Sequence, residues 1–354
     1  MNKISNLLVT WYSAVNINMP WREYNDSYNI WISEIMLQQT QVSTVIPYYN
    51  RWIIKYPEIK SLIKADIDDL LKLWEGLGYY NRVKNIYNTA QIIHTKYNNL
   101  LPNRYDDLLD LPGIGDYTAS AILSIAFNKP YPSIDGNLKR VLTRIYAIHQ
   151  KDQKLKLYKK YVSLFYLDYQ PGIINQALMD LGREVCTFKN PKCNICPVKN
   201  KCIAFKINKI NLFSITKKKK TIPAYNIVVG IIFKKNKFVI SQRKPTGLLA
   251  NLWELPGGKK YEHESAIDCL RREIKEEINI SIKNPIYIGH VKHQYSHFKI
   301  NIDFYCCSYY KGRAKALEAQ QIKWICKKDI NKFTFPTATH KLFKLLNIKN
   351  EHFI

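Results

Sequence analysis

The chain has 354 residues and carries 54 lysines and arginines against 28 aspartates and glutamates, a formal charge of +26. This length is sufficient for two ordinary domains with real cores, and no apolar run approaches the roughly 20 residues of a membrane span. The charge favours a polyanionic partner, either nucleic acid or an anionic membrane surface, although the abundance of Lys, Asn and Ile indicates that part of it is compositional bias. The N-terminus lacks a signal-peptide cleavage pattern, and the eight cysteines do not resemble a secreted disulfide scaffold. We therefore expect a protein of the reducing cytoplasm.

The first 210 or so residues have the pattern of helices joined by short turns. The stretch Ile30–Ile46 has helical length and period, and Pro47 is expected to end it. Asp66–Trp74 has an aspartate suited to an N-cap and an apolar stripe. Because no strand-like alternation precedes residue 222, this half is predicted to be all-α.

A glycine-rich turn lies within the stretch 111–137, between a helix that ends near Leu111 and one predicted over Thr118–Phe127. Gly113 and Gly115 are expected to take backbone angles closed to other residues, so that the turn is sharp and approaches another surface closely. The free N–H groups of the following helix could then bind a phosphate. Asp135, which opens the next helix, supplies a carboxylate a short loop away. A simple turn between two packed helices remains the alternative.

Four cysteines lie within 17 residues in the spacing C-x6-C-x2-C-x5-C. Four thiolates in one short loop can surround a single metal centre, and both zinc and a [4Fe–4S] cluster accept four cysteines. Zinc sites more often use two C-x2-C pairs, and this loop has only one, so the spacing favours iron–sulfur. The predicted ligands are Cys186, Cys193, Cys196 and Cys202.

The pattern changes after the cysteines. Residues 206–224 include a run of four lysines and are predicted to be a basic linker, because such runs are usually solvated. Strand patterns follow, interrupted by a helix near Ser265–Glu277, which indicates a separate α+β domain. The expected organisation is a helical domain over 1–205 with its metal loop at 186–202, the linker, and a second domain over 225–348.

The second domain contains a motif with metal-binding potential. From Gly258 onward the chain fits G-x5-E-x7-R-E-U-x-E-E-x-G-U, with Asn279 in place of the last glycine. Glu273, Glu276 and Glu277 fall at i, i+3 and i+4 on one helix face, where they can share a hard cation such as Mg²⁺. This motif resembles the Nudix box of nucleoside-diphosphate-linked hydrolases.

The helical half resembles the helix-hairpin-helix DNA glycosylases of the endonuclease III superfamily. Three features carry the resemblance: the hairpin with its downstream aspartate, the four-cysteine loop, and SEIMLQQTQV at Ser33–Val42. Members that also cut the strand have a lysine where this chain has Tyr117, so Schiff-base chemistry is not available at that position. The chain is therefore similar to the monofunctional adenine DNA glycosylases. The motifs PWR, WEGLGYYNR, LPGIGDYTA, IDGNLKRV and NQALMDLG match that branch, and the likeness spans essentially the whole chain.

This resemblance implies a multidomain protein that removes adenine paired with 8-oxoguanine or guanine in double-stranded DNA, by hydrolysis, during base excision repair. It also implies a [4Fe–4S] cofactor, and we expect a monomer associated with the nucleoid. Cleavage of an N-glycosidic bond needs an acid for the leaving base and an anion for the cationic sugar. Glu34 lies in an otherwise apolar helix that should raise its pKa, although a glutamate on a helix surface is the commoner case.

The resemblance assigns roles to individual residues. Glu34 would protonate adenine N7, Asp135 would stabilise or attack the sugar, Tyr117 would hydrogen-bond Glu34 or the intermediate, and Asn137 would orient a water or Asp135. The target base must be flipped out of the duplex. Residues implied in binding DNA and its bases are Arg22 and Gln176 at the adenine, Gln39 and Tyr79 in the vacated gap, Gly113 and Gly115 at a phosphate, and Tyr295, Ser296 and His297 at 8-oxoguanine. Tyr79 could equally be an ordinary packing aromatic.

Two interpretations of the second domain remain open at this point. It either recognises 8-oxoguanine in DNA, which we favour, or it also hydrolyses an oxidised nucleotide with Mg²⁺. A nucleotide pyrophosphohydrolase tethered to a catalytically dead DNA-binding module is an alternative of a different class. A glycosylase acting on thymine or uracil mismatches is an alternative within the superfamily.

Overall fold

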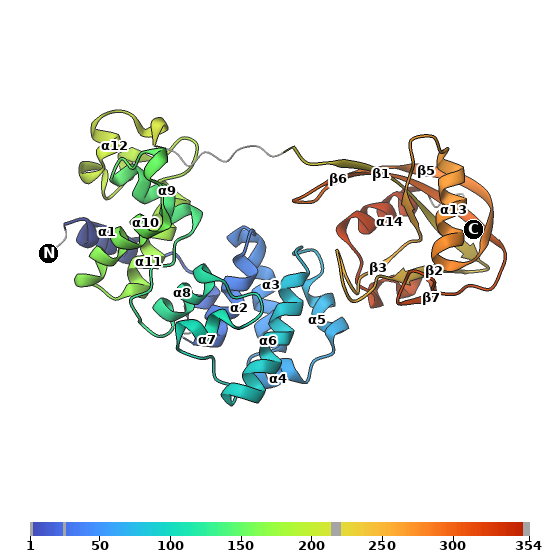
Figure 1. Ribbon diagram of the computed structural model, residues 1–354, viewed down its shortest axis with the longest axis horizontal. Coiled ribbons are helices and arrows are strands. Elements are labelled where there is room, and N and C mark those ends of the chain that lie inside the picture. Colours follow the sequence, from blue (N-terminus) through green and yellow to red (C-terminus); the bar gives the residue numbers. More distant parts are fainter. Residues whose placement is uncertain (1–2, 24–25, 214–220, 350–354) are drawn as a thin grey trace. The chain divides into compact units, whose positions relative to one another are not determined.

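The computed structural model describes residues 3–23, 26–213 and 221–349, and the chain forms two compact units (Figure 1). The first consists of Met1–Lys64 and Asn85–Lys218, and the second of Ala65–Lys84 and Lys219–Ile354. The lysine run within the predicted linker lies outside the described residues. In the part of the chain that the structure describes, no helix combines the length and apolar character needed to cross a membrane.

The first unit is helical, and no strand precedes Ala224 among the described residues, which confirms the all-α prediction. Its α-helices are α1 (Lys3–Val15), α2 (Ser27–Leu37), α3 (Val42–Lys55), α4 (Ile59–Ile63), α7 (Tyr105–Leu109), α8 (Asp116–Ile125), α9 (Gly136–Ile145), α10 (Leu155–Ser163), α11 (Pro171–Asp180) and α12 (Ile203–Lys206), together with α6 (Asn81–Tyr97) from residue 85 onward. Short 3₁₀ or π turns are η1 (Pro20–Arg22), η2 (Gln150–Asp152), η3 (Leu164–Leu167), η4 (Leu181–Val185), η5 (Cys193–Ile195), η6 (Lys199–Lys201) and η7 (Ile210–Leu212).

The prediction of one helix over Ile30–Ile46 was wrong. The chain breaks between α2 and α3, where Gln39 has a φ of +56°, and Pro47 lies inside α3 rather than at a helix end. Four polar residues, 38–41, interrupt the apolar pattern at the break, and the prediction of one continuous helix ran through them. The break matters because it separates α2, which carries Glu34, from the helix that follows.

The glycine-rich turn connects α7 to α8 as predicted, but only one of its glycines is required by conformation. Gly113 has a φ of +81°, and a Cβ there would lie 2.8 Å from both Cβ and Nδ2 of Asn85. Gly115 is extended, with a φ of −102°, and a Cβ there would meet no protein atom within 4 Å. The expectation of special backbone angles is therefore right for Gly113 and wrong for Gly115.

Helix α9 is fixed by an apolar stripe and an N-cap. Leu138, Val141, Leu142 and Ile145 are all at most 2% exposed and pack into the core that α10 and α11 share. Burial of side chains of this size contributes roughly 1.5–3 kcal/mol each. Asp135 caps the helix by accepting the Leu138 N–H, as the sequence indicates for a segment that opens a helix. The packing of α9 thus sets the position of the Asp135 carboxyl.

The second unit has a seven-stranded sheet in the order β3-β2-β1-β6-β5, with β4 paired to β1 and β7 to β2. β1 and β6 run parallel, and the other pairs are antiparallel. The strands are β1 (Ala224–Lys234), β2 (Lys237–Gln242), β3 (Trp253–Glu254), β4 (Gly257–Lys259), β5 (Ser281–Gln294), β6 (Lys299–Lys311) and β7 (Gln321–Cys326), and the helices are α5 (Ile67–Trp74), α13 (Ala266–Ile278), η8 (Lys327–Lys332) and α14 (Thr337–Lys349).

Both faces of this sheet are covered, as alternation along β1 shows. Val228 and Ile232 face the core built with α13, whereas Val229 and Ile231 face the core built with α14. A period of two places alternate residues on opposite faces, so a nearly continuous apolar strand is the expected sequence of a strand buried on both sides. The α+β prediction is confirmed.

Candidate active site

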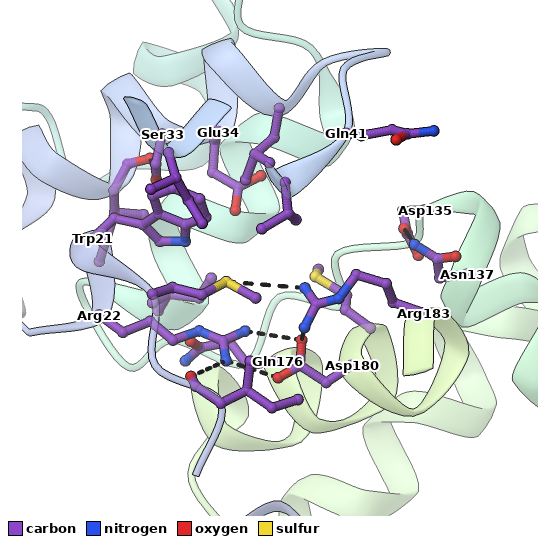
Figure 2. Close-up of a pocket in the computed structure, with 18 of the residues that line it drawn as sticks. Trp21, Arg22, Ser33, Glu34, Gln41, Asp135, Asn137, Gln176, Asp180 and Arg183 are labelled. Atoms are coloured by element: carbon purple, nitrogen blue, oxygen red, sulfur yellow. Dashed lines mark hydrogen bonds and ion pairs between the residues drawn. The ribbon is translucent and has the colours of Figure 1, made fainter. Parts of the chain in front are cut away.

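One pocket of about 830 Å³ in the first unit gathers side chains from η1, α2, α8, α9 and α11 (Figure 2). Segments more than 150 residues apart in sequence therefore meet there. Six residues singled out from the sequence line it: Arg22, Glu34, Tyr117, Asp135, Asn137 and Gln176.

The Glu34 carboxyl is buried at this pocket with little to stabilise its charge. It is 6% exposed in α2, a helix whose residues 28–36 are all buried, and its Oε2 has no hydrogen-bond partner in the part of the chain that the structure describes. Burial raises the pKa of Glu34 to about 7; nearby Asp135 adds to the rise, while Tyr117 and Arg22 partly offset it. This agrees with the raised pKa expected from the apolar sequence, and such a carboxyl can deliver a proton near neutral pH.

Asp135 differs from Glu34 because hydrogen bonds support its charged form. Its Oδ1 accepts the Leu138 N–H at 2.6 Å, and its Oδ2 accepts the Asn137 Nδ2 at 2.9 Å. Burial raises the pKa of Asp135, and these donors act against that rise. Two carboxyls with different hydrogen bonding at one pocket are suited to different roles, one as an acid and the other as an anion.

Tyr117 lies in the first turn of α8 and lines the same pocket as both carboxyls. Burial, followed by the charges of Glu34 and Asp135, raises the pKa of Tyr117 well above its ordinary value. Its hydroxyl donates to Met179 Sδ at 3.7 Å. The phenol therefore remains neutral and keeps its proton at physiological pH.

A buried charge network at the base of the pocket was not predicted from the sequence. Asp180 is fully buried and receives Arg22 through two bonds, Nη1 to Oδ2 at 2.7 Å and Nη2 to Oδ1 at 3.1 Å. Arg183 Nη2 lies 3.0 Å from the same Oδ1 (Figure 2). Asp180 lies in the NQALMDLG motif and Arg183 directly follows it. An aspartate near the end of an apolar helix was the signal in the sequence that could have indicated a buried ion pair. The sequence does not indicate its partner, because Arg22 is 158 residues away.

Gln39 and Tyr79 do not line this pocket, although both are conformational outliers. Their φ angles are +56° and +51°, in the left-handed region that few residues other than glycine adopt. Tyr79 is 39% exposed and belongs to the second unit, within Ala65–Lys84. Gln38, which the sequence did not single out, donates through Nε2 to Gly113 O and Thr118 Oγ1, each at 3.2 Å.

The four clustered cysteines line a small cavity of about 30 Å³. None forms a disulfide, and Arg144 bridges two of them: its Nη1 donates to Cys186 Sγ at 3.3 Å, and its carbonyl accepts from Cys202 Sγ at 3.3 Å. Across the described residues, no group of three or more His, Cys, Asp or Glu is already arranged to hold a single metal ion. Four thiols around one cavity, with an arginine donating to sulfur, fit an anionic metal cluster.

The Nudix-box glutamates are directed to different partners in the second unit. Arg272 donates to Glu273 Oε1 at 2.8 Å and to Glu276 Oε2 at 3.0 Å, and it also pairs with Glu264. Glu277 instead accepts the Gly257 N–H at 3.1 Å, and burial, with the charge of Glu254, raises its pKa to about 8. The helix face is the one predicted, but its carboxylates are engaged within the protein.

A second pocket, of about 510 Å³, lies beside these carboxylates and is lined by Glu273 and Glu277 together with Tyr295. Tyr295 packs on Phe298 with ring centroids 4.8 Å apart, and its N–H donates to the Phe298 carbonyl. The neighbouring Ser296 and His297 are exposed. The turn between β5 and β6 thus presents two polar side chains next to an aromatic pocket wall.

Comparison with known proteins identifies the family. Residues 32–165 match the HhH-GPD superfamily of base excision DNA repair proteins, and residues 228–345 match the NUDIX domain. The chain is 38% identical over 302 residues to the adenine DNA glycosylase of Buchnera aphidicola subsp. Schizaphis graminum, covering 84% of this chain and 85% of that one. The chain belongs to the adenine DNA glycosylase family. It is also 27% identical to the human adenine DNA glycosylase over 96% of its own length and 73% of the human chain.

Solved structures agree with the helical fold of an adenine DNA glycosylase. A thermostable thymine-DNA glycosylase superposes with a TM-score of 0.53 at 25% identity, over 58% of this chain and 95% of that one. A trapped Endonuclease III–DNA covalent intermediate superposes with a TM-score of 0.50 at 23% identity, over 58% and 97%, and shows the fold alone. Family membership confirms the predicted enzyme class, a DNA glycosylase with helix-hairpin-helix and Nudix-like parts.

Gly182 provides a test of how tightly this adenine glycosylase site is held. A Cβ at Gly182 would lie 2.7 Å from Asn137 Cβ and 3.0 Å from the Asn137 carbonyl oxygen, so Gly182→Ala must displace the start of α9. We expect glycosylase kcat/KM to fall roughly 10- to 100-fold, because small misplacements of reacting groups have effects of this size. Gly136→Ala is the matched control, since a Cβ there meets nothing within 4 Å. Equal rates for the two variants would contradict this account.

Proposed function

We propose that this protein removes adenine paired with 8-oxoguanine or guanine in duplex DNA, by hydrolysis of the N-glycosidic bond, as a monofunctional enzyme of base excision repair. One observation carries the proposal. In a chain of the adenine DNA glycosylase family, a buried carboxyl with a pKa of about 7 shares a pocket with a hydrogen-bonded carboxylate. That pair supplies the acid and the anion that depurination requires.

In the proposed mechanism, Glu34 transfers its proton to adenine N7 as the bond between N9 and the sugar C1′ breaks. The bonding electron pair leaves with the neutral purine, and positive charge develops on the sugar. Asp135, held by Leu138 and Asn137, stabilises that charge. A water then adds at C1′ and gives up a proton, which restores the starting protonation of the pair.

The residues around the pocket support simple hydrolysis without strand cleavage. Tyr117 occupies the position that an amine would need for a Schiff base, and no lysine is found among the described residues that line the pocket. The cations there are Arg22 and Arg183, both engaged by Asp180. The expected product is an abasic site in an intact strand.

The DNA contacts are proposed on the family resemblance together with the positions of the side chains. Arg22 and Gln176, which line the pocket, would contact the extruded adenine. Tyr79 and Gln39 would fill the gap in the duplex. Their left-handed backbone conformations support this role, because strained residues often lie at functional sites. The turn at Gly113 would bind a phosphate through its backbone.

The protonation of Glu34 makes the reaction pH-dependent. We expect kcat/KM for adenine release to fall as the pH rises through about 7, because the proton donor is then lost. We expect Glu34→Gln to reduce the single-turnover rate by roughly 10²- to 10⁴-fold below pH 7, and to remove the fall in rate as the pH rises through about 7. Retained adenine release by Glu34→Gln from a duplex with adenine opposite 8-oxoguanine would refute this mechanism.

The Glu34→Gln variant, which should lose activity, should gain thermal stability above neutral pH. A carboxyl whose pKa is raised in the folded state favours folding when it is protonated, so that stability is lost as the pH rises from about 4.5 to about 7. Glu34→Gln mimics the neutral form and should therefore melt at a higher temperature than the wild type at pH 8. A lost activity combined with a raised melting temperature separates a catalytic defect from misfolding.

For the second domain we propose recognition of 8-oxoguanine rather than nucleotide hydrolysis. Tyr295, Ser296 and His297 would contact the lesion from the turn between β5 and β6. Glu273 and Glu276 are already paired with Arg272, so neither carboxylate is available to bind Mg²⁺ without losing that partner. This pairing supports recognition of the lesion rather than hydrolysis.

This assignment predicts that the purified protein with Mg²⁺ releases no diphosphate from 8-oxo-dGTP. The matched test variant is Arg272→Ala, which frees Glu273 and Glu276 from their ion pair. Diphosphate release by the wild type that disappears in Glu277→Gln would contradict the reader assignment and establish a second, Mg²⁺-dependent activity.

We propose that Cys186, Cys193, Cys196 and Cys202 hold a [4Fe–4S] cluster, which would tie together a loop rich in lysine and shape a basic surface for DNA. The cluster has no step in base release. Cys193→Ser is expected to lose iron and sulfide, and to weaken DNA binding more than it slows the bound reaction. Cys326→Ser, in β7, is the control and should retain both. Stoichiometric zinc in place of iron would overturn the assignment.

A further inference from the structure

Glu75 joins two stretches of the second unit that are far apart in sequence. It follows the last residue of α5, and its Oε1 accepts the Phe335 N–H at 2.8 Å and lies 2.8 Å from His340 Nε2. Its Oε2 accepts Lys72 Nζ at 2.6 Å, and the same ammonium donates to the Phe333 carbonyl at 2.9 Å. Both oxygens of this carboxylate are therefore committed to fixed donors.

The Glu75 charge is maintained by these donors. Burial alone would raise the pKa of Glu75, but the hydrogen bonds from His340, Lys72 and the Phe335 N–H outweigh it and lower the pKa. Charge-assisted bonds of this kind are shorter and stronger than neutral ones. The contact between α5 and the segment 333–340 is thus a directed polar one, and the Glu75 side chain is only 16% exposed.

The residues directly after Glu75 form the turn that carries Tyr79. Trp74 Nε1 donates to the Gly78 carbonyl at 3.0 Å, and Arg82 Nη2 donates to the Leu77 and Gly78 carbonyls at 3.3 and 3.0 Å. The Arg82 guanidinium also lies over the Tyr79 ring, 5.2 Å from its centroid. These hydrogen bonds join the turn to Trp74, which directly precedes Glu75. The turn should therefore move with Glu75 rather than independently of it.

On its other side, the segment 333–340 borders the pocket that Tyr295 lines. Pro336, Ala338 and Thr339 form part of that pocket wall. Phe335 is fully buried in the same core as Trp253, whose N–H donates to the Thr334 carbonyl at 2.9 Å. The segment therefore has the lesion-side pocket on one side and the Glu75 carboxylate on the other.

We propose that Glu75 is a positioning residue that couples recognition at the Tyr295 pocket to the placement of Tyr79, through the segment 333–340. This inference rests on the proposed function, in which the second domain reads 8-oxoguanine and Tyr79 fills the duplex gap. Its consequence is that Glu75 determines how strongly the enzyme prefers adenine opposite 8-oxoguanine over adenine opposite guanine. Glu75 touches neither base in this account.

The test measures single-turnover adenine release and duplex affinity for both pairings, in the wild type, Glu75→Ala, His340→Ala and the double variant. Glu262→Ala is the matched control, because Glu262 is exposed in the same unit and its loss changes the net charge equally. We expect Glu75→Ala to reduce the 8-oxoguanine-to-guanine ratio of single-turnover rate divided by dissociation constant at least about fivefold, the lower end of typical coupling between sites. The guanine-paired rate and the control should change little.

Two further results support the coupling. Glu75→Ala and His340→Ala should be non-additive in the ratio, because they remove the same contact. Glu75→Gln, which keeps an acceptor oxygen for the Phe335 N–H, should retain most of the preference.

An equal loss on both duplexes, or an unchanged ratio, would overturn the inference and leave Glu75 as a structural tie. If Glu75→Ala does not fold, an unchanged ratio in His340→Ala overturns it in the same way. Failure of the proposed function looks different, since the wild type itself would then release no adenine from either duplex.

Discussion

The active site of this enzyme depends on keeping one carboxyl, that of Glu34, buried, with no hydrogen-bond partner for its Oε2 among the described residues. A rise in pKa from 4.5 to about 7 corresponds to a cost on the order of 3 kcal/mol in the ionised form. That cost is a large share of the stability of an ordinary domain. The helix that carries Glu34 offsets it with apolar neighbours, since Trp31 and Ile32 are fully buried and Ile35 nearly so. The chemistry and the packing of α2 are therefore inseparable.

Asp135 shows the complementary solution in the same pocket. Its carboxylate is the N-cap of α9, so the bonds that begin the helix also favour the charged form. Arg140 extends this arrangement, because its Nη2 donates to both Asn137 Oδ1 and the Gly182 carbonyl. The side chain of Asp135 is thus held by α9 itself and by the start of η4. In the proposed mechanism these two carboxyls have opposite tasks, because protein hydrogen bonds stabilise the charge of Asp135 and do little for that of Glu34.

How much of this could be read from the sequence depends on the range of each interaction. The helix start at Asp135 and the turn at Gly113 are local, and the sequence predicted them, whereas the burial of Glu34 was expected only once the family resemblance was added. The partnership of Arg22 with Asp180 is not local, since nothing near either residue indicates the other across 158 positions. The break before α3 was missed for another reason, because one helix was predicted through the polar residues 38–41, whereas the backbone turns at Gln39. Family resemblance brought the pocket residues together where periodicity could not.

The segment 65–84 shows that contacts, rather than the order of helices and strands along the sequence, determine to which compact unit a segment belongs. Its helical sequence predicts membership of the helical half, yet its carboxylate at Glu75 is bound by groups more than 250 residues later. A helix of eight residues is too short to be stable alone, so α5 must derive its stability from what it packs against. The strained turn at Tyr79 directly follows it, and such strain persists only where surrounding contacts impose it. The conformation of a residue held in this way depends on the contacts that hold it. We therefore expect the placement of Tyr79 to change when ligand binding at the C-terminal sheet changes the contacts of Glu75.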